Sequence, residues 1–296
     1  MLNYKSINFR WEGGRRLADN QDVAYILPSD QSEVDRLQLN HQMWKLYKSP
    51  IHEKLVKGIR VLDIGCGPGW WTLNRYTAVS QIQLIFFKDM AKAYPNSEFV
   101  GIDMADIFVT KNVPPNVSFR VMNAGTGLDF PDESFDFVFQ RFLVMGFSVE
   151  QYLQSVKEMK RILKSGGSIE ILELVNVYDN AGPALCQISS WINDAMQARG
   201  LDSFIADKIS GYLQDAGYCN ITDFNYNIPI GPWGGDVGRM FLAIQRMALA
   251  AVKVMVTELV HVTEEEYLNT MAKALNETNS YHPFTRFRLI HGVKLN

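Results

Sequence analysis

The chain is poor in cysteine, and neither its cysteines nor its histidines show a metal-binding spacing. The three cysteines, Cys66, Cys186 and Cys219, lie far apart in a chain of 296 residues. Their spacing provides neither a disulfide framework nor a zinc motif, so we expect no metal ion. The first residues also lack the charged start and apolar core of a signal peptide. These absences favour an intracellular protein of the cytoplasm or the nucleus.

Charge of one sign and long hydrophobic runs are also missing. The formal net charge is -3, from 29 Lys and Arg against 32 Asp and Glu, and no basic block stands out. We therefore expect no nucleic acid as a main partner. The longest apolar stretch, residues 247–256, contains Lys253 and is too short to span a bilayer, so we expect no membrane association. The length and the ordinary globular composition favour one large domain with an appended cap.

The most informative feature is a glycine-rich segment that follows an apolar run. Asp63 lies near the end of this run, and glycines follow at every second position, at Gly65, Gly67 and Gly69. The run predicts a buried parallel strand, and the glycines let a ligand approach the backbone because they carry no Cβ. An acid two residues before a G-x-G-x-G loop is typical of S-adenosylmethionine (SAM) sites. A dinucleotide fingerprint would place its third glycine where Trp70 stands, so the spacing disfavours an NAD-dependent oxidoreductase.

Polar residues also follow the next two predicted strands. Residues 99–103 form a strand that ends in Asp103, where a carboxylate can accept hydrogen bonds from both ribose hydroxyls. Residues 117–121 form the third strand, which runs into Asn123, where an amide can read the adenine amino group. Open α/β sheets bind ligands at the carboxyl edge of their strands, so we expect these groups to line one cofactor site.

An apparent insertion separates the glycine segment from the second acid. Asp103 lies 36 residues after Gly67, whereas the corresponding acid of the analogous dinucleotide fold lies about 20 residues after its loop. The excess falls on residues 74–88, whose helical pattern is poor. Without it, residues 71–73 and 89–92 join into one amphipathic helix. Two explanations stay open, a retained intron and a surface loop that interrupts the helix, and sequencing the mature transcript decides between them.

The remaining pattern predicts an α/β core with a helical excursion before its last strand. Gln140 and Arg141 stand at the carboxyl end of a buried strand, and Gly166–Gly167 is expected to cap the helix that follows. Glu173 lies near the end of the fifth strand. The elements predicted after the third strand are strand 135–139, helix 148–163, strand 168–174, helix 205–216, edge strand 218–228, a long helix from 236, a helix with a capping box at 263–266, and strand 284–291.

With these residues assembled, the chain resembles the class I SAM-dependent methyltransferases, and more closely the fungal LaeA-like type, also called the UMTA or TAM-domain type. The likeness covers nearly the whole chain. The glycine motif is specific to the superfamily, whereas the N-terminal pattern Leu-Pro-x-Asp followed by Asp-Arg-Leu is the more specific signal for the subgroup. The segments that carry the resemblance are 14–16, 25–30, 33–37, 130–136, 140–141, 163–167, 229–235 and 263–267.

The resemblance implies a doubly wound, mostly parallel, seven-stranded sheet of the Rossmann-like methyltransferase fold, with an N-terminal helical lead and a helical cap. It divides the chain into four parts, with acceptor specificity in the lead and the cap. These parts are a lead or lid over 1–55, a SAM-binding core over 56–230 that contains the 74–88 insertion, a cap over 231–283, and the last core strand over 284–296.

The resemblance also implies which residues bind SAM. The glycine motif would form the SAM loop, with Asp103 on the ribose, Met104 beside the adenine, and Gln140 under the methionine end. Tyr25 and His41, on the lead, would close over the cofactor. The cofactor-binding residues expected are Tyr25, Asp63, Gly65, Cys66, Gly67, Gly69, Asp103, Met104, Asn123, Ala124 and Gln140.

Methyl transfer from SAM needs positioning more than a catalytic motif, because the sulfonium is already activated. Four residues are candidates for a catalytic role: Gln140, Arg141, Glu173 and His41. The alternatives are an ion pair for Arg141, hydrogen bonds to backbone for Glu173, and a helix-surface position for His41. The favoured hypothesis is a methyltransferase for a small-molecule or protein acceptor. The second is a regulator of secondary metabolism that keeps the SAM fold and acts through protein partners, and a homodimer is also open.

Overall fold

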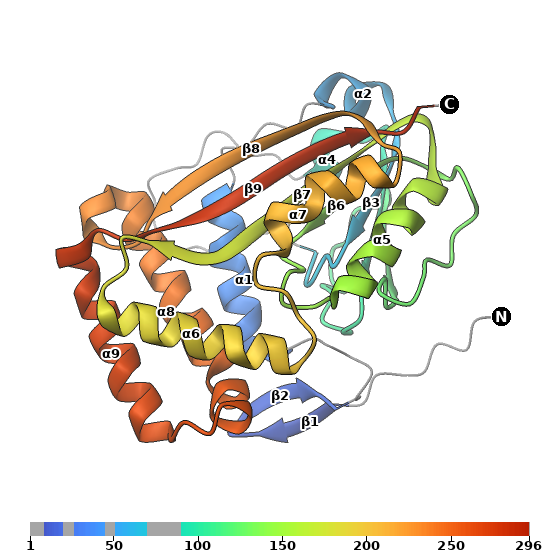
Figure 1. The fold of residues 1–296 in the computed structure, drawn as a ribbon. Helices are drawn as coiled ribbons and strands as arrows, with labels where there is room; N and C mark the ends of the chain where they lie inside the picture. The colour runs from blue at the N-terminus through green and yellow to red at the C-terminus, as the bar shows by residue number, and fades with distance from the viewer. Residues whose placement is uncertain (1–8, 20–26, 45–50, 70–89, 296) are drawn as a thin grey trace.

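The centre of the protein is a seven-stranded sheet in the computed structural model, which describes residues 9–19, 27–44, 51–69 and 90–295 (Figure 1). Its strands are β3 (Arg60–Ile64), β4 (Glu98–Asp103), β5 (Val117–Val121), β6 (Phe135–Arg141), β7 (Leu163–Asp179), β8 (Cys219–Pro229) and β9 (Phe284–Val293). They lie in the order β5-β4-β3-β6-β7-β9-β8. The first five pair in parallel, and β9 is antiparallel to both of its neighbours. The predicted doubly wound, mostly parallel sheet is confirmed.

Helices cover both faces of the sheet. They are α1 (Gln31–Met43), α2 (His52–Lys57), α4 (Met90–Ala93), α5 (Val149–Ile162), α6 (Pro183–Ala198), α7 (Ile205–Asp215), α8 (Gly235–Leu259) and α9 (Glu264–Tyr281). Successive side chains of a strand point to opposite faces. Leu62 and Ile64 of β3 therefore join the core with α5 and α7, while Val61 packs with α2 and α4. Because both faces are covered, the carboxyl edge of the strands is the place for a ligand.

Helix α5 begins at a capping box but ends without a glycine cap. The Ser148 hydroxyl accepts from the Gln151 N–H, and the Gln151 side chain accepts from the Ser148 N–H. The helix ends at Ile162 and β7 starts at the next residue, so the expected cap at Gly166–Gly167 is wrong. These two glycines instead exchange backbone hydrogen bonds of 2.9 Å with Lys294. Pairing with the end of the chain therefore replaces the local cap.

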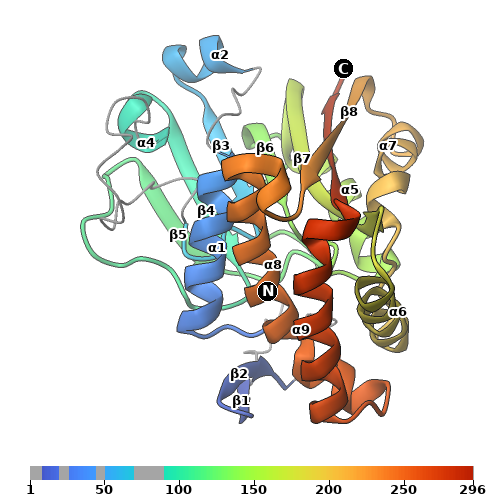
Figure 2. The same cartoon turned by 90° about the vertical axis from the view of Figure 1, so that its left-hand side faces the viewer.

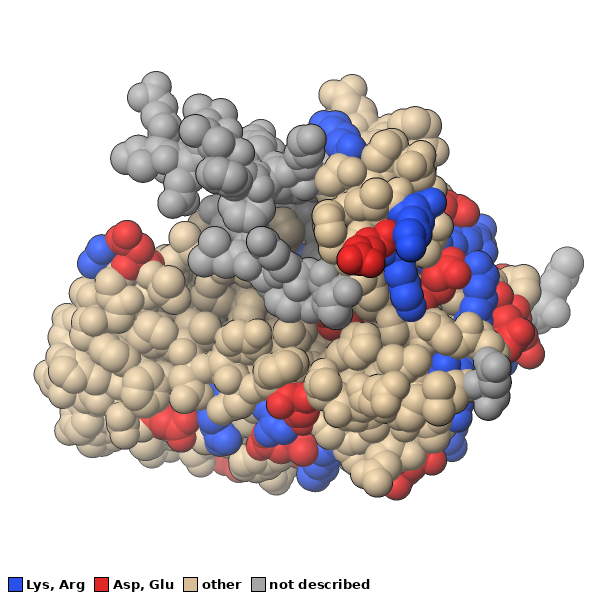
Figure 3. Space-filling model, turned by 90° about the horizontal axis from the view of Figure 1, so that it is seen from above, with Lys and Arg blue, Asp and Glu red and all other residues tan. Residues whose placement is uncertain are grey.

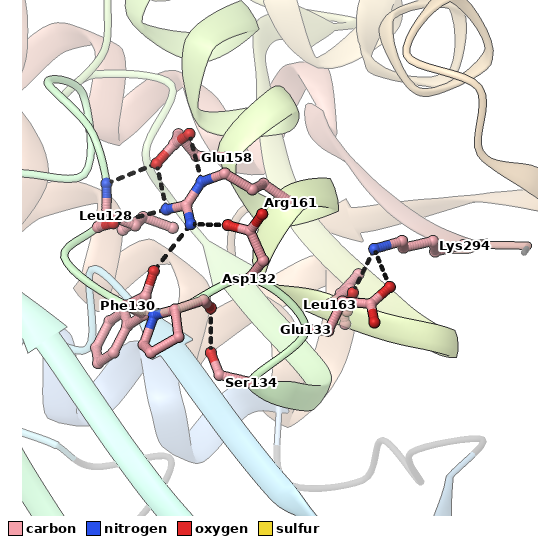
Figure 4. A network of polar contacts seen from close by, with 10 residues as sticks. Leu128, Phe130, Asp132, Glu133, Ser134, Glu158, Arg161, Leu163 and Lys294 are labelled. Carbon is pink, nitrogen blue, oxygen red and sulfur yellow. Dashed lines mark hydrogen bonds and ion pairs between the residues drawn. The ribbon is translucent and has the colours of Figure 1, made fainter.

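Arg161, near the end of α5, fixes the turn that leads into β6. Its guanidinium donates to the main-chain oxygens of Leu128 and Phe130 at 2.7 and 2.9 Å (Figure 4). It also donates to the carboxylates of Asp132 and Glu158 at 2.7 and 2.8 Å. The rigid fork of donors on arginine suits such a set of acceptors. One side chain on a helix thus holds a turn that lies about thirty residues earlier in the chain.

A helical layer packs beside the long strands β7, β9 and β8. β7 has 17 residues, more than the predicted 168–174, and it runs past the carboxyl end of β6. Helices α8 and α9 lie between β8 and β9 in the chain, as predicted, whereas α6, which packs on both, was not predicted. Among the described helices, Pro232–Leu259 is long and apolar enough to cross a membrane, but half of its most apolar window is buried. A core helix of a soluble protein meets the same test, so this is weak evidence for a membrane span.

The N-terminal lead consists of a hairpin and a helix. The strands β1 (Phe9–Glu12) and β2 (Arg15–Ala18) pair antiparallel, a hairpin that was not predicted. Arg15 donates twice to the Asp30 carboxylate, at 2.6 and 3.1 Å. Asp30 also accepts from the Glu33 N–H at 3.1 Å, at the start of α1. These bonds fix the hairpin to α1, which packs along α8 (Figure 2).

The surface seen in Figure 3 carries charges of both signs. Acidic and basic side chains are intermixed on its right-hand part, and much of its left-hand part carries neither. This distribution matches a composition with nearly equal numbers of acidic and basic residues, 32 against 29. On the described part of this face, the picture shows no large block of basic side chains.

Candidate functional site

The glycine loop leaves β3 at the point where the winding of the sheet reverses. β3 lies between β4 and β6, so its carboxyl end is the switch point at which doubly wound sheets bind ligands. Gly65, Gly67 and Gly69 have φ angles of +66°, +54° and +85°, a region that residues with a Cβ avoid. A Cβ on Gly65 would also lie 2.6 Å from Leu143 Cδ2. The sequence motif therefore corresponds to a backbone that glycine adopts without strain.

Asp103 ends β4 and holds the glycine loop. One carboxylate oxygen accepts from the Gly67 N–H at 2.8 Å, and the other accepts from the Ala105 N–H at 2.9 Å. Burial raises the pKa of this carboxyl group, and the two hydrogen bonds oppose that shift. Each oxygen can accept a second bond, so the carboxylate can still bind a ligand hydroxyl. The chemistry at this position therefore fits the ribose of SAM.

Asp63 and Cys66 lie beneath the loop. Asp63 is only 1% exposed, and its charge favours the ionised form of the Arg141 guanidinium. The Cys66 thiol is buried and donates to the Gly67 main-chain oxygen at 3.6 Å. Burial, first of all, raises the pKa of this thiol, so it stays neutral. The Cys66 side chain therefore offers no negative charge to a ligand.

The residues expected at the adenine lie beside the end of β4. The Met122 N–H donates to the Asp103 main-chain oxygen at 2.9 Å, which brings the segment after β5 next to Asp103. The Asn123 side-chain oxygen accepts from the Gly125 N–H at 3.0 Å. Asn123 and Met104 are half-buried, and Ala124 is buried. Their positions fit the adenine side of a cofactor site. Tyr25 lies outside the described residues.

Gln140 and Glu173 form a buried network with Tyr152. The Gln140 amide donates to the Tyr152 hydroxyl at 2.9 Å, and that hydroxyl donates to Glu173 Oε1 at 3.1 Å. The Glu173 carboxylate also accepts from the N–H groups of Leu143 and Val144 at 2.9 and 3.2 Å. Gln140 and Glu173 are both 0% exposed, and burial raises the pKa of Glu173 to about 7. The Glu173 carboxylate thus holds the loop after β6, and Gln140 is bonded to the same network. The sequence suggested that both side chains contact a ligand, but their polar atoms are already bonded within the protein.

Arg141 and His41, the other two catalytic candidates, lie together. The Arg141 Nη1 lies 3.3 Å from His41 Nδ1 on α1. Because arginine is always a donor, Nδ1 must accept, so His41 is neutral with its proton on Nε2. One turn earlier on α1, Leu37 Cδ1 lies 3.4 Å from where a Cβ on Gly67 would be. Helix α1 is therefore a wall of the site, running from the glycine loop to Arg141.

Sequence reasoning missed the other residues on this wall. Asn40 is buried on α1, and the Trp44 ring lies edge-on to Phe287 with centroids 4.9 Å apart. Residues 37, 41 and 44 recur at helical spacing, which the sequence shows. The sequence does not show which part of the protein this side of the helix faces. Among the described residues, no group of three or more His, Cys, Asp or Glu side chains could hold a metal ion.

The site geometry agrees with a comparison against protein families. Residues 61–167, which include the glycine loop, Asp103 and Glu158, match the family model described as "Methyltransferase domain". This central part of the chain is therefore similar to methyltransferase domains. The matched range includes the strands β3 to β6 and α5, which supply most of the candidate site.

Curated relatives extend the similarity beyond this domain. "Secondary metabolism regulator LAE1" of Cochliobolus heterostrophus is 28% identical over 243 residues, which is 77% of this chain and 72% of that protein. "Methyltransferase pytC" of Aspergillus terreus is 26% identical over 241 residues, 77% of this chain and 68% of that protein. The similarity therefore includes a protein named as a regulator and one named as a methyltransferase.

Solved structures share the fold. The YcgJ protein from Bacillus subtilis has a TM-score of 0.50 and 21% identity, and the alignment covers 88% of this chain and 99% of that one. The MccD protein has a TM-score of 0.50 and 14% identity, with 87% and 96% covered. At these identities the likeness concerns the fold alone.

Proposed function

We propose that this protein is a SAM-dependent methyltransferase that transfers a methyl group to a small-molecule or protein acceptor. The hydrogen bond between the Gly67 N–H and the Asp103 carboxylate carries this proposal. It joins the loop after β3 to the acid at the end of β4 in one site, at the switch point of the sheet. The methyltransferase domain over residues 61–167 supports it, because that family implies SAM as the cofactor.

The residues of the chain would divide the binding of SAM between them. The loop at Gly65, Gly67 and Gly69 lets a ligand approach the backbone, and Asp103 accepts hydrogen bonds from ribose hydroxyls. Asn123 and Met104 lie on the adenine side. Bound SAM supplies a methyl group that is already activated by its sulfonium. The protein then needs chiefly to align an acceptor with that methyl group, and alignment of this kind can contribute about 7–11 kcal/mol to catalysis.

The regulatory hypothesis is the weaker alternative. It draws on the name of one group of relatives, such as the regulator from Cochliobolus heterostrophus. No contact among the described residues favours a role through partners over methyl transfer. A protein that binds cofactor but methylates nothing in an extract supplied with radiolabelled SAM would support it.

Calorimetric titration with S-adenosylhomocysteine tests the proposed function. The 296-residue chain and a form without residues 74–88, which lie outside the described residues, are titrated side by side. Micromolar binding by either form supports the cofactor assignment, and binding by the deletion form alone supports a retained intron. No binding by two well-folded forms contradicts the proposal.

A further inference from the structure

The Arg141 guanidinium forms no ion pair with any described residue. Among the described residues, no carboxylate lies within ion-pair distance of its guanidinium, and its one hydrogen bond is to neutral His41. Its other near neighbours are the rings of Phe139 and Phe142, with centroids 5.9 and 5.6 Å away. Burial lowers the pKa of this guanidinium, and the more distant Asp63 opposes that shift. A half-buried charge in such surroundings is costly unless a counter-ion joins it.

Two buried polar atoms, one on α1 and one directly after its end, have no hydrogen-bond partner among the described residues. Asn40 is 5% exposed and its Oδ1 has no hydrogen bond. The buried Nε1 of Trp44 likewise has none, although the ring contacts Phe287 and Tyr226, with centroids 4.9 and 5.8 Å apart. Buried polar groups are nearly always paired, and leaving one unpaired destabilises the fold. An unpaired acceptor near the end of α1 and an unpaired donor directly after it, four residues apart, therefore indicate a ligand that supplies their partners.

These atoms lie next to the proposed methyl donor. Leu37 of the same helix lies 3.4 Å from where a Cβ on Gly67 would be, and His41 lies 3.3 Å from Arg141. From Leu37 to Trp44 a helix rises by about 10 Å. The span thus begins at the cofactor loop and ends at the aromatic side chains of β8 and β9. A planar molecule of two or three rings has this length.

We propose that Arg141, Asn40 and Trp44 bind the methyl acceptor, and that this acceptor is a planar aromatic small molecule carrying an oxyanion. The inference rests on the proposed function. Arg141 pairs with the oxyanion, the Trp44 N–H donates to a second acceptor group, Asn40 accepts from a hydroxyl, and the rings of Phe142 and Phe287 contact the planar body.

The chemistry of this assignment balances without a catalytic base. An oxygen lone pair of the acceptor forms the new O–CH3 bond, while the C–S bond of the sulfonium breaks and its electron pair stays on sulfur. An anion and a cation thereby become two neutral products, the methylated acceptor and S-adenosylhomocysteine. No proton has to leave, which agrees with Glu173 being occupied by backbone N–H groups.

The test is a binding measurement with a matched pair of probes. 2-Naphthoate carries the oxyanion, and 2-naphthamide is its neutral isostere. Each is titrated into the protein saturated with S-adenosylhomocysteine. We expect naphthoate to bind at least tenfold more tightly than the amide. Arg141→Met should remove that difference, and Arg246→Met, which removes an exposed arginine of α8, should preserve it. Equal affinity of the two probes, or no binding of naphthoate at millimolar concentration, overturns the proposal.

Arg141→Met also tests whether Arg141 binds the acceptor or the cofactor, because the methionine moiety of the cofactor carries a carboxylate of its own. 5′-Methylthioadenosine lacks this carboxylate and S-adenosylhomocysteine has it. We expect Arg141→Met and Arg141→Lys to change the affinity for both by less than twofold. A tenfold loss for S-adenosylhomocysteine alone would assign Arg141 to the cofactor and overturn the proposal. No cofactor binding by the wild type would instead refute the proposed function.

Substitution of Asn40 distinguishes a role in binding from a role in stability, because the two properties should change in opposite directions. Asn40→Leu removes an unpaired buried amide and keeps the volume, so we expect Tm to rise by about 2–4 °C while naphthoate binding weakens at least threefold. Trp44→Phe, which keeps a ring and removes the N–H, should weaken binding without lowering Tm by more than about 4 °C. Unchanged naphthoate affinity in both variants contradicts the placement of the acceptor on α1.

Discussion

The cofactor side and the acceptor side of the site are built in different ways. On the cofactor side, one five-residue loop supplies successive backbone groups, and a single acid from the next strand, Asp103, holds it. On the acceptor side, Trp44 follows the end of α1, while Arg141 and Phe287 come from two strands that are distant in the chain. The first arrangement is local and leaves a pattern in the sequence. The second depends on how distant elements pack, so its residues look unrelated until the fold is known.

A bulky residue in the loop is the strongest way to test the cofactor side. Gly67→Val should abolish binding of S-adenosylhomocysteine, a loss of at least about 100-fold, because a branched side chain disfavours a φ of +54° and would crowd Leu37. Isothermal titration measures it. Gly200→Val is the matched control, since Gly200 has a φ of +71° with nothing within 4 Å of its Cβ position. An equal loss in both variants would indicate general unfolding instead of a blocked site.

Removing the acid that holds the loop should have the next largest effect. Asp103→Ala loses the acceptor for the Gly67 and Ala105 N–H groups and for the ribose. The binding free energy for S-adenosylhomocysteine should therefore weaken by about 1–3 kcal/mol. Asp106→Ala, an exposed acid three residues on that pairs with Arg16, should change it by less than twofold. Titration with S-adenosylhomocysteine compares them. Unchanged affinity of Asp103→Ala would remove this residue from the site.

The buried carboxyl group of Glu173 on β7 should make the stability of the protein depend on pH. Its pKa is raised from 4.5 to about 7 by burial, so the unfolded state loses its proton before the folded state does. The stability should therefore fall as the pH rises from about 4.5 to 7, by at most about 3 kcal/mol. Glu173→Gln should flatten the profile of Tm between pH 5 and 8, whereas Glu265→Gln, an exposed residue of α9, should not. A wild-type Tm that rises across this interval would contradict the shift.

The smallest effect is expected at a local feature that lies away from the ligand. Ser148→Ala removes the side-chain acceptor of the α5 capping box and should lower the free energy of unfolding by about 1 kcal/mol. Thr263→Ala at the start of α9 should cost a similar amount. Urea unfolding measures both. Neither change should alter the affinity for S-adenosylhomocysteine, and a change of tenfold would show that α5 shapes the site.

The predicted fold was confirmed where the local pattern was strong. The buried strands that end near Ile64, Asp103 and Arg141 could be read because apolar runs end in polar residues. Helix α6 and the hairpin of β1 and β2 were missed. The end of α5 was misplaced because Gly166–Gly167 has the sequence of a cap, yet it pairs with Lys294, more than a hundred residues away.

For the candidate site, the sequence placed residues at the ends of strands where the structure has them, but it did not give the partners of their side chains. Gln140 and Glu173 stand near the ends of their strands, as predicted, but their side chains bond to Tyr152 and to backbone in the core. Periodicity places a residue on an element, but the partner that occupies a buried amide or carboxylate comes from packing. That is why the four catalytic candidates could not be ranked from the sequence.

By itself, the sequence determined the sheet, the glycine loop and the acid that faces it, because buried parallel strands need apolar runs and a left-handed backbone needs glycine. Only the tertiary structure decided that α1 lies near the loop at Gly67 and that His41 meets Arg141. It also decided that Asn40 Oδ1 and Trp44 Nε1 have no hydrogen-bond partner within the described part of the chain. His41 and Arg141, for example, lie 100 residues apart in the chain. Packing free energy brings such segments together, and no short-range pattern records it.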